Sequence, residues 1–261
     1  MKYEPVQKGN PHSLVINQHI FPKRSIERFC ERVGSVDLLI LTSKKRLQLK
    51  PENPIFCVHR SWDERAEKVY GKRIEDKFQS VLEEVLQGTS LSADYVSQVL
   101  TDFYYLWQIR HYWSKLSIED KDIGVKPEFS LEVDEQESLE KAHISYLKGN
   151  GNIPSRLWRG LRMQQNLDDA IEKMSGIKWG MLTASEGEFL VPDNFSEITI
   201  VPVNPNLCFA AGYDSQTIGL SKVSYINSLA VSNADRYIFA RDFTKCPTAT
   251  NELSDLIQTA R

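Results

Sequence analysis

Two neighbouring stretches of the chain carry apolar residues at the spacing of long helices, and they limit the possible folds of its 261 residues more than any other feature. The first begins with Ser61-Trp-Asp-Glu64, a capping-box pattern typical of a helix start, and ends at Gly88. The second runs from about Ser92 to Trp113. Because the link Gln87–Leu91 is short, we expect the two helices to return antiparallel as a long helical hairpin.

Strand patterns occur towards both ends of the chain. Residues 36–42 and 46–50 are expected to form a hairpin, because the second run alternates strictly between apolar and polar side chains. The C-terminal third holds further short apolar runs separated by turn residues. These runs cover residues 178–183, 189–191, 198–203, 207–211 and 236–240.

These patterns predict one α+β domain spanning residues 1–261. It is expected to be mainly helical, with the long antiparallel hairpin packed on a small mixed or antiparallel sheet built from both ends of the chain. Residues 115–140 hold nine acids against three bases, so an acidic loop at about 115–134 is expected to join the two halves. A last short helix is expected over residues 252–260.

Composition is that of an ordinary soluble globular protein, with 41% hydrophobic and 26% charged residues. No apolar run approaches the ~18 residues of a membrane helix, and the first ten residues lack the apolar core of a signal peptide. We therefore predict a cytoplasmic protein without membrane contact, and the sequence leaves its oligomeric state open. The four cysteines lie far apart, which predicts free thiols.

Charge is divided unevenly along the chain. Residues 1–77 hold 16 Lys and Arg against 10 Asp and Glu, whereas the whole chain has a net charge of −3. Two interpretations stay open for the basic third: contact with phosphate or nucleic acid, and an ordinary solvated surface.

The segment Asn17–Phe29 offers the first candidate chemical group. Pro22 suits the start of a helix whose apolar stripe continues to Val33. His19 lies just before that start, where exposed N–H groups and the helix dipole favour an anion.

Several short patterns of this chain resemble a bacterial family described only as domain of unknown function 4238. Its members open with His-x-x-Pro-x-x-x-[Leu/Ile]-x-x-Phe, which His19, Pro22, Ile26 and Phe29 match. The other matching pieces are Ile74-Glu75 with Glu83, Phe189–Asn194, Pro205–Cys208, Ile226-Asn227 and Ala234–Tyr237. Phe195 stands where the family usually has proline. The resemblance implies no settled activity, although related genes look like accessory or mobile-element defence genes.

A hydrolytic site is the first functional hypothesis. His19 would act as a general base or ligand, and carboxylates would hold Mg²⁺ or Mn²⁺, which lowers the pKa of a bound water and clamps a phosphodiester. The residues assigned to this site are catalytic His19, Glu75 and Asp193, metal ligands Glu75, Glu83 and Asp193, phosphate-binding Lys23, Arg24 and Arg28, and supporting Pro22, Arg110 and Asn194. On this hypothesis the chain is a metal-assisted nucleic-acid hydrolase or a toxin-like effector of bacterial defence.

Other hypotheses remain beside it. His19, Asn53 and His59 loosely suggest an HNH-type nuclease, whereas His111 and His143 are interpreted as structural. The chain lacks a Gly-x-Ser-x-Gly elbow and the phosphate-binding Gly-x-x-x-x-Gly-Lys loop. The alternative is a non-catalytic partner-binding or regulatory module, in which the acidic loop contacts a partner protein or shields the basic face.

Overall fold

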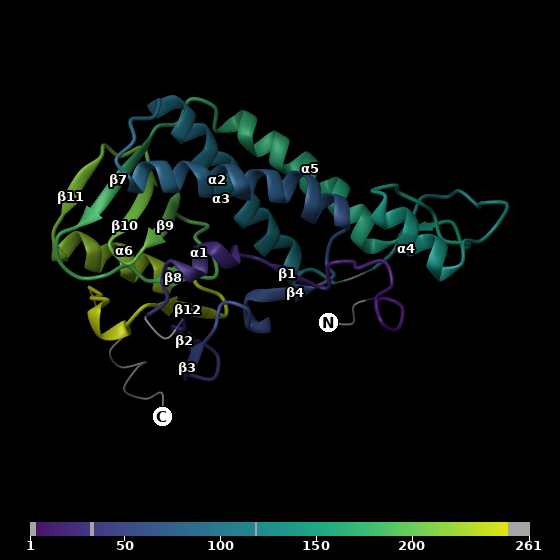
Figure 1. The fold of residues 1–261 in the computed structure, drawn as a ribbon, viewed down its shortest axis with the longest axis horizontal. Helices are drawn as coiled ribbons and strands as arrows, with labels where there is room; N and C mark the ends of the chain where they lie inside the picture. Colours follow the sequence, from purple (N-terminus) through teal and green to yellow (C-terminus); the bar gives the residue numbers. More distant parts are fainter. Residues whose placement is uncertain (1–3, 32–33, 118, 250–261) are drawn as a thin grey trace.

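Helix α3 (Ala93–Lys115) lies at the centre of the fold, which a computed structural model describes for residues 4–31, 34–117 and 119–249 (Figure 1). It packs against α2 (Lys72–Leu86), α5 (Ser155–Lys173) and two strands, β7 (Trp179–Ala184) and β9 (Ile200–Asn204). A helix in contact with neighbours on several sides needs apolar residues around much of its circumference. Its buried apolar side chains are Val99, Leu100, Phe103, Tyr104, Leu106, Trp107 and Ile109.

A four-stranded sheet is formed by the C-terminal third, in the order β11-β7-β10-β9. Strand β10 (Leu207–Ala211) pairs antiparallel with both β7 and β9, and β11 (Gln216–Ile218) adds in parallel to β7. Helix α6 (Leu220–Asn233) follows directly after β11 and lies beside this sheet (Figure 1). The sheet thus has helices near it on more than one side.

A second four-stranded sheet, in the order β3-β2-β12-β8, joins the two ends of the chain. The hairpin of β2 (Val36–Ile40) and β3 (Lys45–Leu49) meets β12 (Tyr237–Ala240), and β8 (Val191–Pro192) pairs with β12 on the other side. Every residue of β12 is buried. Contact between segments about 200 residues apart therefore closes this part of the fold.

The remaining elements are short. Strand β1 (Asn17–His19) pairs with β4 (Cys57–His59), and β5 (Lys121–Asp122) pairs with β6 (Asn152–Ile153). The other helical segments are α1 (Lys23–Glu27), α4 (Val133–Lys141), a π-helix (Ala66–Gly71) and 3₁₀ turns at Pro54–Phe56 and Phe243–Lys245. The predicted α+β class is confirmed, but the described residues form several small sheets in place of the single one expected.

The start of the first long helix differs from its prediction. Asp63, not Ser61, caps it, because Oδ1 of Asp63 accepts the N–H of Ala66 at 3.0 Å. The chain then forms the π-helix before α2 begins. Gly71 permits this turn, since a Cβ there would lie 2.6 Å from the carbonyl oxygen of Ala66 and 2.8 Å from Nη2 of Arg110. The π-turn therefore leaves room for a buried guanidinium.

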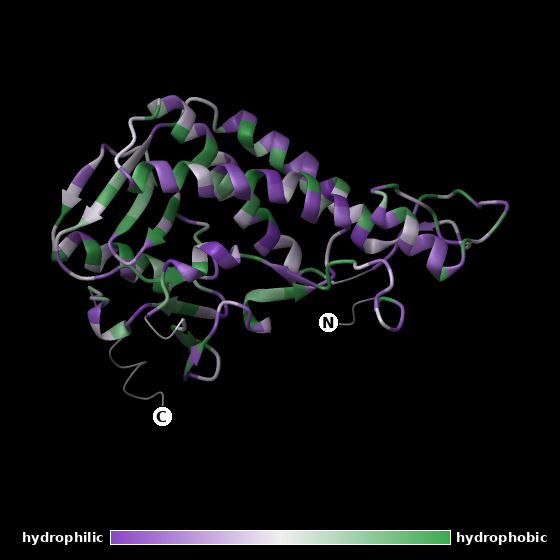
Figure 2. Ribbon diagram, in the orientation of Figure 1, coloured by the Kyte–Doolittle hydropathy of each residue, from purple (hydrophilic) through white to green (hydrophobic). Residues whose placement is uncertain are grey.

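The apolar core joins distant parts of the chain, and Figure 2 shows hydrophobic residues on the strands and on the inner helix faces. The ring of Phe21 lies 4.8 Å from that of Trp107 and 6.1 Å from that of Phe239. All four cysteines are free, as predicted. Within the described ranges, no helix combines the length and apolar character needed to cross a membrane. The predicted helix over 252–260 lies outside the described residues.

Candidate functional site

His19 and the helix after it do not form the predicted anion site. His19 is half-buried at the end of β1, and its Nε2 lies 3.0 Å from the carbonyl oxygen of Pro51. Helix α1 is only five residues long and ends at Glu27, so the expected helix to Val33 is wrong. Pro22 stands at the N-cap with an extended backbone. A helix this short has only a small dipole, because the helix dipole is the sum of many aligned peptide dipoles.

The three basic residues proposed to bind phosphate already have protein partners. Nζ of Lys23 lies 2.6 Å from Glu52, and Nη2 of Arg24 lies 2.5 Å from Oε1 of Glu83. Arg28 donates to Oε1 of Gln79 at 2.9 Å. Glu83, proposed as a metal ligand, is thus the exposed partner of Arg24.

Glu75 belongs to a separate, partly buried ion cluster between the π-helix, α2 and α3. It pairs with the guanidinium of Arg110, which is 1% exposed and also lies 3.3 Å from Glu67. Glu67 accepts the indole N–H of Trp62 at 2.8 Å, and the guanidinium lies 5.7 Å from the Trp62 ring centre. Burial would lower the pKa of Arg110, but the two carboxylates outweigh it and raise that pKa. Arg110, predicted as a supporting residue of the site, thus forms an ion pair with Glu75.

Asp193 is buried at the end of β8, and two backbone groups and two side chains surround it. Its carboxylate accepts the N–H groups of Asp235 and Arg236 at 2.9 and 3.1 Å, and Nε of Arg236 at 3.3 Å. Nε2 of His111 lies 3.7 Å from Asp193 and 3.1 Å from Asp235. Burial would raise the pKa of Asp193, but the nearby His111 and the donors from Asp235 and Arg236 bring it below its usual value. Asn194 beside it is also buried.

These positions correct the predicted metal centre. Across the described part of the chain, no three or more His, Cys, Asp and Glu side chains are grouped so that they could hold a metal ion. Glu75, Glu83 and Asp193, the proposed ligands of Mg²⁺ or Mn²⁺, therefore do not form one such group, and each has a different cationic partner. The sequence reasoning missed His111 as a partner of Asp193. Its position next to Arg110, among the aromatic residues of this helix, is the signal that could have suggested it.

Asp63 has the most perturbed carboxyl pKa of the site region. Burial raises that pKa to about 7, although the carboxylate caps the N–H of Ala66. Gly160 packs closely against it, since a Cβ there would lie 2.1 Å from Oδ1 of Asp63. Strongly shifted groups occur in functional sites and in structural networks alike. Here the tight packing and the capping bond indicate a structural role.

The raised pKa gives a pH-dependent prediction. The folded protein keeps the Asp63 proton up to about pH 7, whereas an unfolded chain loses it near the ordinary value of 3.8. The Asp63 contribution to stability is therefore greatest below pH 4 and falls as the pH rises to 7. Asp63→Asn keeps the cap, so its free energy of unfolding relative to wild type should rise over this window by at most about 1.4 kcal/mol per pH unit.

Urea unfolding at pH 5, 6, 7 and 8 measures this difference. The exposed Asp76→Asn variant is the control for removing one carboxylate. A constant difference between Asp63→Asn and wild type at all four pH values would contradict the prediction.

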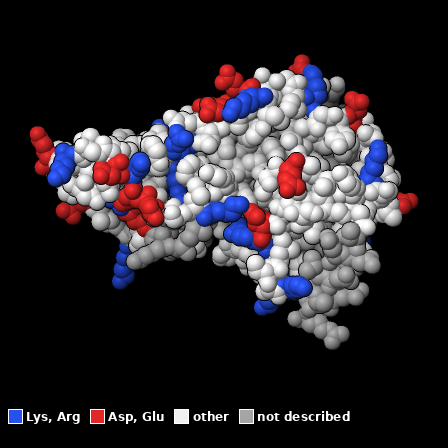
Figure 3. Space-filling view, turned by 180° about the vertical axis from the view of Figure 1, so that it is seen from behind, with Lys and Arg blue, Asp and Glu red and all other residues white. Residues whose placement is uncertain are grey.

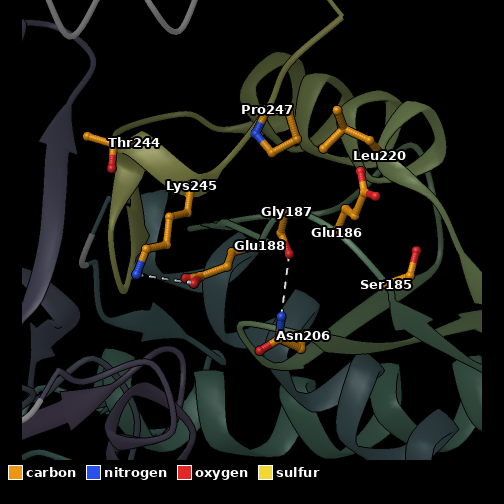
Figure 4. A pocket seen from close by; sticks show the side chains of 9 residues that line it. All are labelled: Ser185, Glu186, Gly187, Glu188, Asn206, Leu220, Thr244, Lys245 and Pro247. Atoms are coloured by element: carbon orange, nitrogen blue, oxygen red, sulfur yellow. Dashed lines mark hydrogen bonds and ion pairs between the residues drawn. The ribbon is translucent and has the colours of Figure 1, made fainter.

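Two of the surface hollows in the described part of the chain have volumes above 400 Å³. The first, of about 460 Å³, lies by the 185–188 loop and the start of α6 (Figure 4). Several of its polar groups are already paired: Lys245 lies 3.8 Å from Glu188, which also pairs with Arg241, and Asn206 donates to the carbonyl of Gly187 at 3.4 Å. The second, of about 430 Å³, lies between α6 and the β11-β7-β10-β9 sheet and has a mainly apolar lining. The second therefore suits a ligand better.

Comparison with protein-family models, with curated proteins and with solved structures gave no match.

Proposed function

We propose that this chain is a non-catalytic partner-binding protein, and that residues 119–153 form its docking lobe for a basic partner protein. The lobe contains the β5–β6 pair and α4 and protrudes from one end of the molecule (Figure 1). The observation that carries the proposal is a group of exposed apolar side chains among carboxylates on this lobe.

Several large apolar side chains of the docking lobe are exposed to solvent. Phe129 is 73% exposed, which is a large aromatic area left in water. Four aliphatic side chains of the lobe are 42–55% exposed, namely Ile123, Val125, Val133 and Ile144. Aromatic side chains of this kind provide much of the binding energy when a partner covers them.

The charge of the docking lobe is strongly negative. It holds nine Asp and Glu against four Lys and Arg. Glu119, Asp122 and Glu128 are exposed and have no ion-pair partner in the described part of the chain. Figure 3 shows carboxylates, a smaller number of basic side chains and uncharged surface together at the protruding end. Carboxylates next to apolar groups favour a surface with lysine or arginine around its own apolar residues.

A buried ion cluster holds the docking lobe to the body. Oε2 of Glu140 on α4 lies 2.7 Å from Nη2 of Arg60 and 2.7 Å from Nε of Arg156, and all three side chains are at most 4% exposed. The backbone N–H of Gln7 also donates to Glu137 at 2.8 Å. An exposed surface on a fixed support loses less conformational entropy when it binds.

The hydrolase hypothesis has less support from the same geometry. Glu75, Glu83 and Asp193 each form an ion pair with a different arginine side chain, and the basic residues near His19 are paired as well. A catalytic group needs to reach its substrate, and Asp193 is buried behind backbone donors.

A pair of model peptides tests the docking lobe. We expect a labelled amphipathic peptide of Lys, Leu and Ala to bind, and the same peptide with Glu for Lys not to bind, in fluorescence anisotropy. Phe129→Ser should weaken binding of the basic peptide about tenfold, and added salt should weaken it further. Tyr95→Ser, which removes an exposed aromatic from α3, is the matched control and should bind like wild type. Equal binding of the two peptides, or no effect of Phe129→Ser, would overturn the proposal.

A photo-crosslinking residue in place of Phe129 tests the partner's charge in cells. The segments captured there should be basic, and the same residue in place of Tyr95 should not capture them. Acidic captured segments would contradict the proposed charge complementarity.

A further inference from the structure

The hollow between α6 and the β11-β7-β10-β9 sheet has the form of a small-molecule site. The strands provide one wall and α6 the other, and the chain around Tyr213 lies at its edge. Its volume of about 430 Å³ falls within the range of ~300–1,000 Å³ usual for such sites.

The interior of this hollow is apolar. From the sheet, Leu182, Ile200 and Ile218 are at most 6% exposed, and Ala210 and Ala211 are too small to fill the space in front of them. From α6, Ile226 and Leu229 face them. Apolar walls around unfilled space favour a ligand with an apolar body, because burial of that body removes its surface from water.

The mouth of the hollow is positively charged. Nζ of Lys222, in the first turn of α6, lies 3.1 Å from Oε1 of Gln216, which is a neutral partner. In residues 4–31, 34–117 and 119–249, no carboxylate forms an ion pair with Lys222. The side chains of Tyr213 and Tyr225 stand at the same hollow and are 57% and 59% exposed. A cation with only a neutral neighbour, beside an apolar interior, favours an anion attached to an apolar group.

We propose that this hollow binds a small amphipathic carboxylate, with its apolar chain between the sheet and α6 and its carboxylate on Lys222. The site is separate from the docking lobe, and the proposal does not depend on partner binding. The small volume and the single cation of its lining favour a free small molecule over a helix of another protein, which would need a longer apolar groove.

Calorimetric titration of the full chain with three ligands of equal chain length tests this site. They are decanoate, decanol and decyltrimethylammonium, each kept below its micelle concentration. Decanoate is expected to bind more tightly than decanol, and decyltrimethylammonium more weakly than either. Lys222→Met should weaken decanoate about fivefold, the effect of one exposed ion pair, and leave decanol unchanged. Lys68→Met, at an exposed lysine of the π-helix, is the matched control.

Two filling variants test the place of binding. Ala211→Trp and Leu229→Trp introduce bulk from opposite walls, and either should abolish binding of decanoate and decanol. Circular dichroism shows which of the two keeps the fold, and that variant decides the result. Unchanged binding in a folded filling variant would overturn the site. Equal affinity for the anionic and cationic ligands, or an unchanged decanoate affinity in Lys222→Met, would overturn the assigned ligand class.

Discussion

Arg110→Ala is expected to lower the free energy of unfolding by about 3–5 kcal/mol, which corresponds to a fall of roughly 6–20 °C in the melting temperature. The guanidinium is buried, and it separates the carboxylates of Glu67 and Glu75. Without it the two carboxylates face each other beside an empty space, and the indole of Trp62 loses the cation over its ring. Loss of the buried member of an ion cluster costs far more than loss of a surface pair, because the two partly buried carboxylates lose the charge that compensates them.

Two variants make this prediction specific. Lys72→Ala breaks the exposed Lys72–Asp76 pair on α2 and should cost at most about 0.5 kcal/mol. Glu75→Gln keeps an acceptor for Arg110 and should fall between the two, since Glu75 is 25% exposed. Urea unfolding followed by circular dichroism measures all three. If Arg110→Ala and Lys72→Ala had the same midpoint, the ion cluster would not stabilise the fold.

The sequence predicts elements of this fold better than their ends. Apolar periodicity indicated helices over most of α2 and α3, because these helices bury many residues at helical spacing. The π-helix could not be read from the same spacing, since it depends on the approach of Arg110 from another helix to Gly71. The early end of α1 at Glu27 was not predicted either. Ile26 within the helix and Phe29 after it are both buried, so apolar spacing does not show where the helix ends.

The candidate site was harder to predict than the fold. The hydrolase hypothesis assigned Glu75 and Asp193 as metal ligands, and both are instead held by specific protein partners. Those partners, Arg110 and His111, are consecutive on α3 but serve two separate clusters. Spacing along the chain carries no information about which long-range partner a carboxylate meets. The hollow beside α6 could not be predicted from the sequence either, because its volume depends on the distance between a helix and a sheet.

The second large effect is expected at Trp107, which also tests whether the chain folds as the single domain that the sequence predicts. Its ring centre lies 4.8 Å from that of Phe21 and 6.4 Å from that of Phe195, and its indole N–H donates to the carbonyl of Asp193 at 3.2 Å. This one side chain on α3 therefore contacts both the N-terminal segment and the C-terminal third. Trp107→Ala is expected to cost about 3–5 kcal/mol, because it removes a fully buried indole and leaves a cavity.

The form of the transition distinguishes one domain from two. If residues 1–261 unfold as one unit, the Trp107→Ala curve shifts as a single transition, with the same midpoint by circular dichroism and by fluorescence of the remaining tryptophans. Tyr112→Ala removes an aromatic that is 53% exposed on the same helix, so its midpoint should stay close to that of wild type. Two separate transitions, of which Trp107→Ala moves only one, would show that the halves fold independently. The contacts of Trp107 with both halves favour the single transition, since loss of this side chain weakens the packing of each half on α3.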